Sequence, residues 1–341
     1  LEKSGRDITQ AVEYQFQQFA AGESREFPST FLGVHGGDWR VAWERYRDWL
    51  RTWQQPMVPR NEWFRRVWNF RTSWVKFFKG DTWIDPETGQ YRTAEMIARD
   101  TELFGPIDMN HFFDWRQSDQ YGRWGDYNHF EEIGGLDAFR RMIAEHHEAG
   151  IRVGLYLDVY LCSKKSEIGQ TLAQDWAIKR ENGTWTDGYS TADDPVWNMC
   201  VRHPAWREYL SDRCAEAARM TGADGVYIDE GGADLRNYWC WRDDHPHQVP
   251  GCSQEGFLEL CRETRAKLPA ETVLYTEFAP ADFIIPYIDG GYTTALGRSD
   301  FQISPGFTHI HRFAFPDFKL IPITSGGSIS FGIWDGLRYC L

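Results

Sequence analysis

The sequence lacks any apolar run long enough to cross a membrane. A spanning helix needs about 20 consecutive apolar residues, and polar residues interrupt every such stretch although 42% of the 341 residues are hydrophobic. Basic residues are also few, because 37 Lys and Arg stand against 50 Asp and Glu, a net charge of −13. Phosphate binding depends on clustered basic side chains. This balance therefore argues against a nucleic-acid partner and favours a neutral one.

Short motifs for metals and phosphates are missing as well. The seven cysteines have no repeating spacing and no C-x-x-C pair, so they specify neither a disulfide framework nor a standard zinc site. No glycine-rich phosphate-binding motif follows an expected strand. We therefore expect no cofactor and no bound metal, and the oligomeric state stays open. The chain begins at Leu1 without a leader segment, which suggests a piece of a longer protein, and an extracellular or periplasmic location is favoured.

Aromatic residues are abundant, with 17 Trp, 15 Tyr and 22 Phe making up 16% of the chain. Sugar rings present C–H faces that stack on aromatic rings, and their hydroxyls need polar partners beside those rings. The alternative is that these side chains simply fill a large core, where aromatic residues dominate the packing energy. Because Trp is so frequent, we expect an oligo- or polysaccharide substrate.

Residues 1–60 do not have the make-up of a self-contained domain. Residues 8–19 predict a strand or short helix, residues 41–53 predict an amphipathic helix, and Pro56 and Pro59 then end the pattern. We expect this segment to be the end of a preceding domain with a connector, followed by a catalytic barrel over residues 61–341.

From residue 67 onward, apolar strand-like runs alternate with helical periods, which is typical of a parallel α/β architecture. We expect strands at 67–78, 107–115, 151–159, 225–229 and 272–278, weaker ones at 284–296 and 313–323, and helices at 136–149, 206–220 and 254–268. A further helix is expected to start near 334–339. Either the last strands lie within 313–331, or the barrel does not close within this sequence.

Acidic residues stand at the carboxyl ends of four expected strands, namely Asp114, Asp158, Asp229 and Glu277. The active sites of barrel enzymes are assembled from those strand ends. Together with the missing nucleotide motifs, this pattern favours a TIM-type (β/α)8 barrel over a doubly wound open sheet.

Asp229 is the expected catalytic nucleophile, because it ends the buried run G-A-D-G-V-Y-I-D-E. The glycine pair Gly231–Gly232 would leave its backbone open to a substrate. Glu277, beside aromatic neighbours, is the expected acid/base of a retaining pair, because desolvation raises the pKa of a carboxyl. Asp289 and Asp300 are rival proton donors. Asp229 as a helix cap or Arg partner, and Glu277 as a hydroxyl-binding or salt-bridge residue, are the structural alternatives.

Other side chains are expected to bind the substrate. Polar contacts are expected from the strand-end acids and stacking from nearby rings, in a set of Asp114, Trp115, Trp124, Tyr156, Asp158, Glu230 and Trp239. Asp158 as a packed polar strand end and Tyr156 as a core residue remain open alternatives.

The segment from Cys240 to Cys252 contains His245 and His247. Two Cys flanking two His are suitable zinc ligands, but their spacing matches no standard zinc pattern. We therefore expect a loop over the site in which His245 or His247 touches the sugar. A Cys240–Cys252 disulfide is the alternative for an exported protein.

Three stretches resemble the barrel core of the alpha-galactosidase and alpha-glucosidase superfamily. They are YNHFEEIGGLDAFRRMIAEHHEAGIRVGLYLDV (127–159), WNMCVRHPAWREYL (197–210) and GADGVYIDE (222–230). The chain looks most like an uncharacterised group of glycosidase-like barrels known as a domain of unknown function. In addition, residues 37–49 resemble the linker that follows an N-terminal β-sandwich, so a remnant of that domain is expected.

The resemblance implies that Asp229 is the nucleophile by direct position. Alpha-galactosidases have Lys and alpha-amylases have Arg two residues earlier, whereas this sequence has Tyr227, so the sugar is not implied. Glu277 is similar to the proton donor of alpha-amylases, whereas alpha-galactosidases take theirs from a later strand. The hypotheses are a retaining glycosidase for alpha-linked glycans, a non-catalytic carbohydrate-binding barrel, and a metal-dependent hydrolase using His245 and His247.

Overall fold

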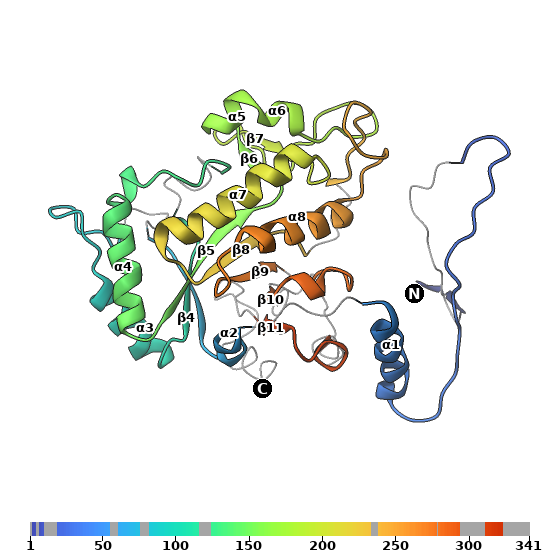
Figure 1. The fold of residues 1–341 in the computed structure, drawn as a ribbon, viewed down its shortest axis with the longest axis horizontal. Helices are drawn as coiled ribbons and strands as arrows, with labels where there is room; N and C mark the ends of the chain where they lie inside the picture. The colour runs from blue at the N-terminus through green and yellow to red at the C-terminus, as the bar shows by residue number, and fades with distance from the viewer. Residues whose placement is uncertain are drawn as a thin grey trace.

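A computed structural model describes residues 2–4, 7–9, 19–54, 61–75, 82–115, 124–232, 238–277, 279–293 and 311–322 (Figure 1). Its main feature is a seven-stranded sheet in the order β11-β10-β9-β8-β5-β4-β3, in which every neighbouring pair is parallel. The strands are β3 (Phe70–Ser73), β4 (Met109–Phe112), β5 (Arg152–Asp158), β8 (Gly225–Asp229), β9 (Val273–Glu277), β10 (Gly290–Thr293) and β11 (Lys319–Pro322). The expected parallel α/β architecture is confirmed.

Helices alternate with these strands and lie along the outer side of the sheet (Figure 1). They are α3 (Thr93–Phe104), α4 (Leu136–Glu148), α7 (Pro204–Thr221) and α8 (Ser253–Lys267). Helix α4 buries Phe139, Met142 and Ile143 along one face, as a 3.6-residue period requires. The sequence did not predict α3, because few of its residues are buried and its apolar stripe is short. In the described ranges, no helix is both long and apolar enough to span a bilayer.

The sheet curls, so that its two edge strands approach each other at their amino ends. Lys319 at the start of β11 donates hydrogen bonds to the carbonyls of Arg65, at 3.2 Å, and of Val67. Both carbonyls lie on the path from α2 (Glu62–Arg66) into β3. Phe64 of α2 packs beneath the strands, with its ring centroid 5.7 Å from that of Tyr275 in β9. The described strands thus form a partial TIM-type barrel. The expected helix at 334–339 lies outside the described residues.

The interior of the curled sheet is filled by a large side chain that faces a glycine. Tyr275 is fully buried, and its hydroxyl lies 2.8 Å from Nδ1 of His111 in β4. A Cβ atom on Gly154 in β5 would lie 2.0 Å from the Tyr275 hydroxyl. A glycine is therefore required at position 154. Burial lowers the pKa of His111 to about 3, so His111 is neutral in this packed layer.

Two loop regions extend beyond the carboxyl ends of β5 and β8. The β5–α7 excursion, residues 159–203, contains the antiparallel pair β6 (Leu161–Ser163) and β7 (Val196–Asn198) with helices α5 (Glu167–Thr171) and α6 (Ala173–Trp176). The β8–α8 loop, residues 230–252, follows Asp229. In Figure 1, α5 and α6 lie beyond the end of the sheet, next to the start of α7.

The N-terminal part contains a short hairpin, β1 (Glu2–Ser4) with β2 (Asp7–Thr9), and helix α1 (Trp39–Trp53). An extended segment between them runs away from the sheet (Figure 1). Helix α1 contacts the barrel, because Gln54 donates to the carbonyl of Asp282 at 2.8 Å and Arg47 lies over the Phe313 ring. The described residues do not show the expected β-sandwich remnant. The boundary near residue 60 stays a prediction.

Candidate active site

Strands β5 and β8 bring the same three residue types to the same levels of the barrel. Residues 154–158 read G-L-Y-L-D and residues 225–229 read G-V-Y-I-D. The register pairs Gly154 with Gly225, Tyr156 with Tyr227, and Asp158 with Asp229. Because alternate residues of a strand face the same side, each strand presents Gly, Tyr and Asp in rising order. Both aspartates therefore lie at the carboxyl edge, where barrel enzymes have their active sites.

The carboxylate of Asp229 is half-buried and accepts hydrogen bonds from two phenols. The Tyr156 hydroxyl donates to Oδ2 at 2.6 Å, and the Tyr227 hydroxyl donates to Oδ1 at 2.5 Å. Tyr227 stands two residues before Asp229, where the resembled families have a cation. The phenols fix both carboxylate oxygens without adding positive charge.

Asp158, by contrast, is fully buried. Its Oδ1 accepts hydrogen bonds from the backbone N–H groups of Tyr160, at 2.8 Å, and Leu161, at 2.7 Å. Burial, and next the charge of Asp229, raise the pKa of Asp158 to about 8. Its Oδ2 lies 3.1 Å from the Tyr156 hydroxyl. The Tyr156 hydroxyl therefore faces both aspartates and lies closer to Asp229 than to Asp158.

Glu230 follows in the left-handed region, with φ +59°, a conformation that costs a residue with a side chain about 1–3 kcal/mol. Its carboxyl group is buried, and Oε2 has no hydrogen-bond partner among the described residues. Burial, followed by the charges of Asp158, Asp229 and Glu277, raises the pKa of Glu230 to about 9. The Tyr189 hydroxyl lies close enough to Glu230 for its own pKa to rise to about 12, through partial desolvation and then the Glu230 charge. Glu230 is thus a neutral carboxylic acid at pH 7.

Glu277 is the last residue of β9, the strand next to β8, and is half-buried. Its backbone carbonyl accepts a hydrogen bond from Gly232 at 3.0 Å. Its charge contributes to the raised pKa values of both Glu230 and Tyr189. The structure therefore brings Glu277 into one carboxyl cluster with Asp158, Asp229 and Glu230.

Two aromatic side chains beside this cluster were missed by sequence reasoning. The ring centroid of Phe113 lies 4.1 Å from that of Tyr156, and Trp74 lies 4.4 Å from Phe113. Both rings are half-buried, and each residue stands just beyond the end of its strand, β3 or β4. Strand parity could have identified Phe113, because it is two residues beyond the inward-facing His111.

Trp115 and Asp114, both expected near the substrate, have other surroundings. Trp115 is fully buried between Phe130 and Phe139, and its Nε1 donates to the Tyr156 carbonyl at 2.8 Å. Trp124 is also buried, and Trp239 is half-buried. Asp114 is buried and accepts a hydrogen bond at 2.5 Å from Val75 N–H, which fixes the exit from β3. Core packing and backbone contacts therefore account for Trp115 and Asp114 better than sugar contact does.

Asp289 is not placed to donate a proton. It precedes β10 at the amino end of the strand, where it forms an ion pair with Arg265 and accepts a hydrogen bond from Leu274 N–H at 2.8 Å. The other rival, Asp300, lies outside the described residues. Packing also explains why position 231 is a glycine, because a Cβ atom there would lie 2.1 Å from the Phe257 ring.

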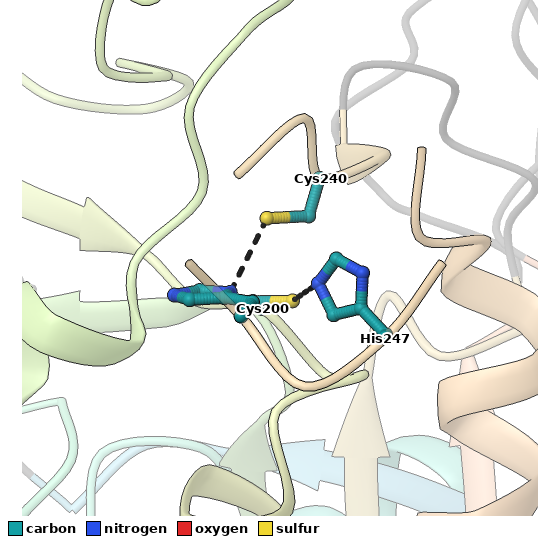
Figure 2. A group of neighbouring side chains, drawn as sticks. Cys200, Cys240 and His247 are labelled. Atoms are coloured by element: carbon teal, nitrogen blue, oxygen red, sulfur yellow. Dashed lines mark hydrogen bonds between the residues drawn. The ribbon is translucent and has the colours of Figure 1, made fainter. Parts of the chain in front are cut away.

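His245 and His247 lie together, but they face cysteines. His245 Nδ1 is 3.4 Å from Cys240 Sγ, and His247 Nε2 is 3.3 Å from Cys200 Sγ. Figure 2 shows the Cys200 sulfur pointing at the His247 ring. Cys252, the alternative disulfide partner of Cys240, is the N-cap residue of α8 and forms no disulfide with Cys240. The expected sugar contact of this loop has no support in this arrangement.

Comparison with known proteins supports the expected resemblance. No curated protein matches the sequence. An alpha-N-acetylgalactosaminidase from Bifidobacterium bifidum, in complex with GalNAc, is similar in fold, with TM-score 0.62 and 16% identity over 90% of this chain and 56% of that one. An alpha-galactosidase from Thermus thermophilus, in complex with p-nitrophenyl alpha-D-galactopyranoside, gives TM-score 0.56 and 13% identity over 87% of this chain and 59% of that one. The chain thus spans less than two thirds of either enzyme.

These likenesses, at low identity, show a shared barrel fold with two glycosidases. The family model described as "Domain of unknown function (DUF6259)" matches residues 27–312, which is most of the sequence. The chain belongs to the DUF6259 family.

Proposed function

We propose that this chain carries the active site of a retaining glycosidase for alpha-linked sugars, with Asp229 as the nucleophile and Glu277 as the acid/base. A retaining enzyme needs one carboxylate that attacks the anomeric carbon and a second carboxyl that protonates the leaving oxygen. The Asp229 carboxylate is oriented by two phenols and is half-buried at the carboxyl edge. That geometry is the observation on which the proposal rests.

Each neighbouring group has a role in this mechanism. Glu277 ends the adjacent strand and lies in the same carboxyl cluster. Glu230 presents a neutral carboxyl group, which suits a hydrogen bond to a sugar hydroxyl. Trp74 and Phe113 form an aromatic row with Tyr156, whose hydroxyl contacts Asp229. Substrate binding by Glu230, Tyr156, Trp74 and Phe113 follows from these positions.

A catalytic metal at His245 and His247 is disfavoured. A hydrolytic zinc site keeps one coordination position open for water, whereas these histidines lie with two cysteines that complete a set of four protein ligands. The metal-dependent hydrolase is therefore not the function proposed for this chain.

Aryl alpha- and beta-glycosides of several sugars test the proposal directly. We expect release of the aryl group from an alpha-glycoside with net retention at the anomeric carbon, measured by NMR of the first product. Asp229→Asn should lower kcat/KM at least about 10⁴-fold, because the attacking group is lost. Glu95→Gln, on an exposed helix position, is the matched control and should leave the rate unchanged.

Azide identifies the acid/base residue. Azide can replace water as the nucleophile that attacks the glycosyl-enzyme intermediate, and unlike water it needs no general base. It therefore restores turnover of an activated aryl glycoside when only the acid/base residue is missing. We expect rescue of Glu277→Gln with formation of a glycosyl azide. Rescue of Asp300→Asn instead would transfer the role to Asp300. Binding of oligosaccharides without any turnover, unchanged by Asp229→Asn, would favour a non-catalytic carbohydrate-binding barrel.

A further inference from the structure

Four ligating side chains converge where the β5–α7 excursion meets the β8–α8 loop. Cys200 comes from the excursion, and Cys240, His245 and His247 come from the loop. One ligand atom from each lies within 4.8 Å of all the others. Both cysteines and His245 are buried and His247 is half-buried. Figure 2 shows Cys200, Cys240 and His247 gathered around one point between two chain segments.

Hydrogen bonds to carbonyl groups decide which nitrogen of each ring carries the proton. His245 Nε2 lies 2.9 Å from the carbonyl oxygen of Asp175, and His247 Nδ1 lies 2.9 Å from that of Gln248. A carbonyl can only accept, so each of these nitrogens is the donor. The opposite nitrogens, which face Cys240 and Cys200, therefore present lone pairs. Carbonyl contacts of this kind orient histidine ligands in metal sites.

The spacing also matches a tetrahedral ion. With zinc–sulfur bonds of about 2.3 Å and zinc–nitrogen bonds of about 2.0–2.1 Å, sulfur and nitrogen ligands lie about 3.5 Å apart across a tetrahedron. The two Cys–His pairs lie 3.4 Å and 3.3 Å apart. Two thiolates also neutralise the charge of a divalent cation, so the buried site would hold no net charge. Among first-row metals, two sulfur and two nitrogen ligands favour zinc.

We propose that Cys200, Cys240, His245 and His247 bind one structural zinc ion. Binding replaces the two thiol protons, which leave to solvent as the zinc–sulfur bonds form. Because all four positions of the tetrahedron are filled by protein, the ion has no open site for a substrate. From the cysteine spacing we expected no bound metal. This proposal replaces that expectation, because the fourth ligand is Cys200, which lies 40 residues before Cys240.

The ion would fasten together the two loop regions that border Asp158 and Asp229. Backbone hydrogen bonds and close packing hold the segments that carry the ligands in place. Gly251 pairs with Cys240 through two backbone hydrogen bonds, of 3.1 and 2.7 Å, and a Cβ atom on Gly251 would lie 2.7 Å from the His247 ring. Arg242 donates to the carbonyls at the end of α6, which holds the loop against the excursion. This site is independent of the proposed glycosidase activity.

Zinc content of the purified chain tests the proposal. After expression with added zinc and gel filtration in metal-free buffer, we expect about one zinc per chain by inductively coupled plasma mass spectrometry. Cys200→Ser and His247→Gln should each lose most of it, while Cys252→Ser, in the same loop but outside the set, should retain it. Cobalt in place of zinc should give the intense visible absorption of a tetrahedral thiolate site.

Chelation provides a readout that does not depend on the variants folding. Removing the ion should lower the Tm by several degrees, and zinc should restore it, because metal binding contributes to folding free energy. A wild-type chain with reduced thiols that binds neither zinc nor cobalt would overturn the proposal. So would an intact mass 2 Da below that of the reduced chain, with the missing thiols mapped to Cys200 and Cys240, since a disulfide would then occupy the site.

Discussion

Replacing Asp158 with Asn tests whether a proton on this side chain orders the hydrogen bonds that reach Asp229. Burial, and then the Asp229 charge, raise the pKa of Asp158 from 3.8 to about 8. An Asn side chain copies the shape of the protonated acid. Its oxygen can accept from the N–H groups of Tyr160 and Leu161, and its amide can donate to the Tyr156 oxygen. It cannot ionise, so only the pH dependence should change.

The sign and size of the effect follow from proton binding. Between about pH 4 and about pH 8, the folded protein keeps a proton on Asp158 that the unfolded chain has released. The free energy of unfolding therefore falls as pH rises through this range and levels off above it. A pKa moved from 3.8 to about 8 corresponds to about 6 kcal/mol, at about 1.4 kcal/mol per pKa unit. Asp158→Asn should match the wild type near pH 4 and be more stable by about that amount at pH 9.

Urea unfolding followed by Trp fluorescence at pH 4, 6, 8 and 9 measures this difference. Glu95→Gln, whose parent side chain is 61% exposed, is the control and should follow the wild-type curve. Parallel curves for the wild type and Asp158→Asn, at any offset, would refute the reasoning. Such curves would mean that Asp158 is ionised in the folded protein.

Two further changes address the packed layer and the aromatic side of the site. Gly154→Ala places a methyl group 2.0 Å from the Tyr275 hydroxyl, so overpacking and the loss of the His111 hydrogen bond should lower the free energy of unfolding by about 2–4 kcal/mol. Urea midpoints measure it, and Gly36→Ala, with no atom within 4 Å, should cost little; equal midpoints for both would contradict the packing argument. Trp74→Ala should raise KM about 20-fold with kcat nearly unchanged, since about 70 Å² of covered sugar at about 25 cal/mol/Å² is about 2 kcal/mol. A loss confined to kcat would contradict a binding role.

The strand pattern could be predicted because buried parallel strands leave a strong signature in sequence. The expected strand at 225–229 matches β8 in full, and the one at 272–278 contains β9. Helices with a wide apolar face, such as α4 and α7, could also be predicted. The excursion with α5 and α6 could not be predicted, because its elements are short and depend on packing against α7 rather than on their own periodicity.

The site was only partly predictable, because strand ends fix position but not surroundings. Asp229 and Glu277 could be selected from their places after buried strands. Trp115 could not be distinguished from a stacking residue, because only the fold shows that its ring turns into the core. Cys200 could not be assigned to the histidines, because 40 residues that include α7 and β8 separate it from Cys240.

The paired G-x-Y-x-D strands show how one pattern can yield two carboxyl groups with different chemistry. Asp158 and Asp229 stand at the same level on neighbouring strands, and Tyr156 lies within hydrogen-bond distance of both. The β5–α7 excursion covers Asp158 and removes it from water, so the proton is more stable there. Asp229 remains half-exposed and receives both phenol protons, so the negative charge is more stable there. The environment of each strand end, and not the residue type, therefore separates a proton-holding acid from a carboxylate able to attack.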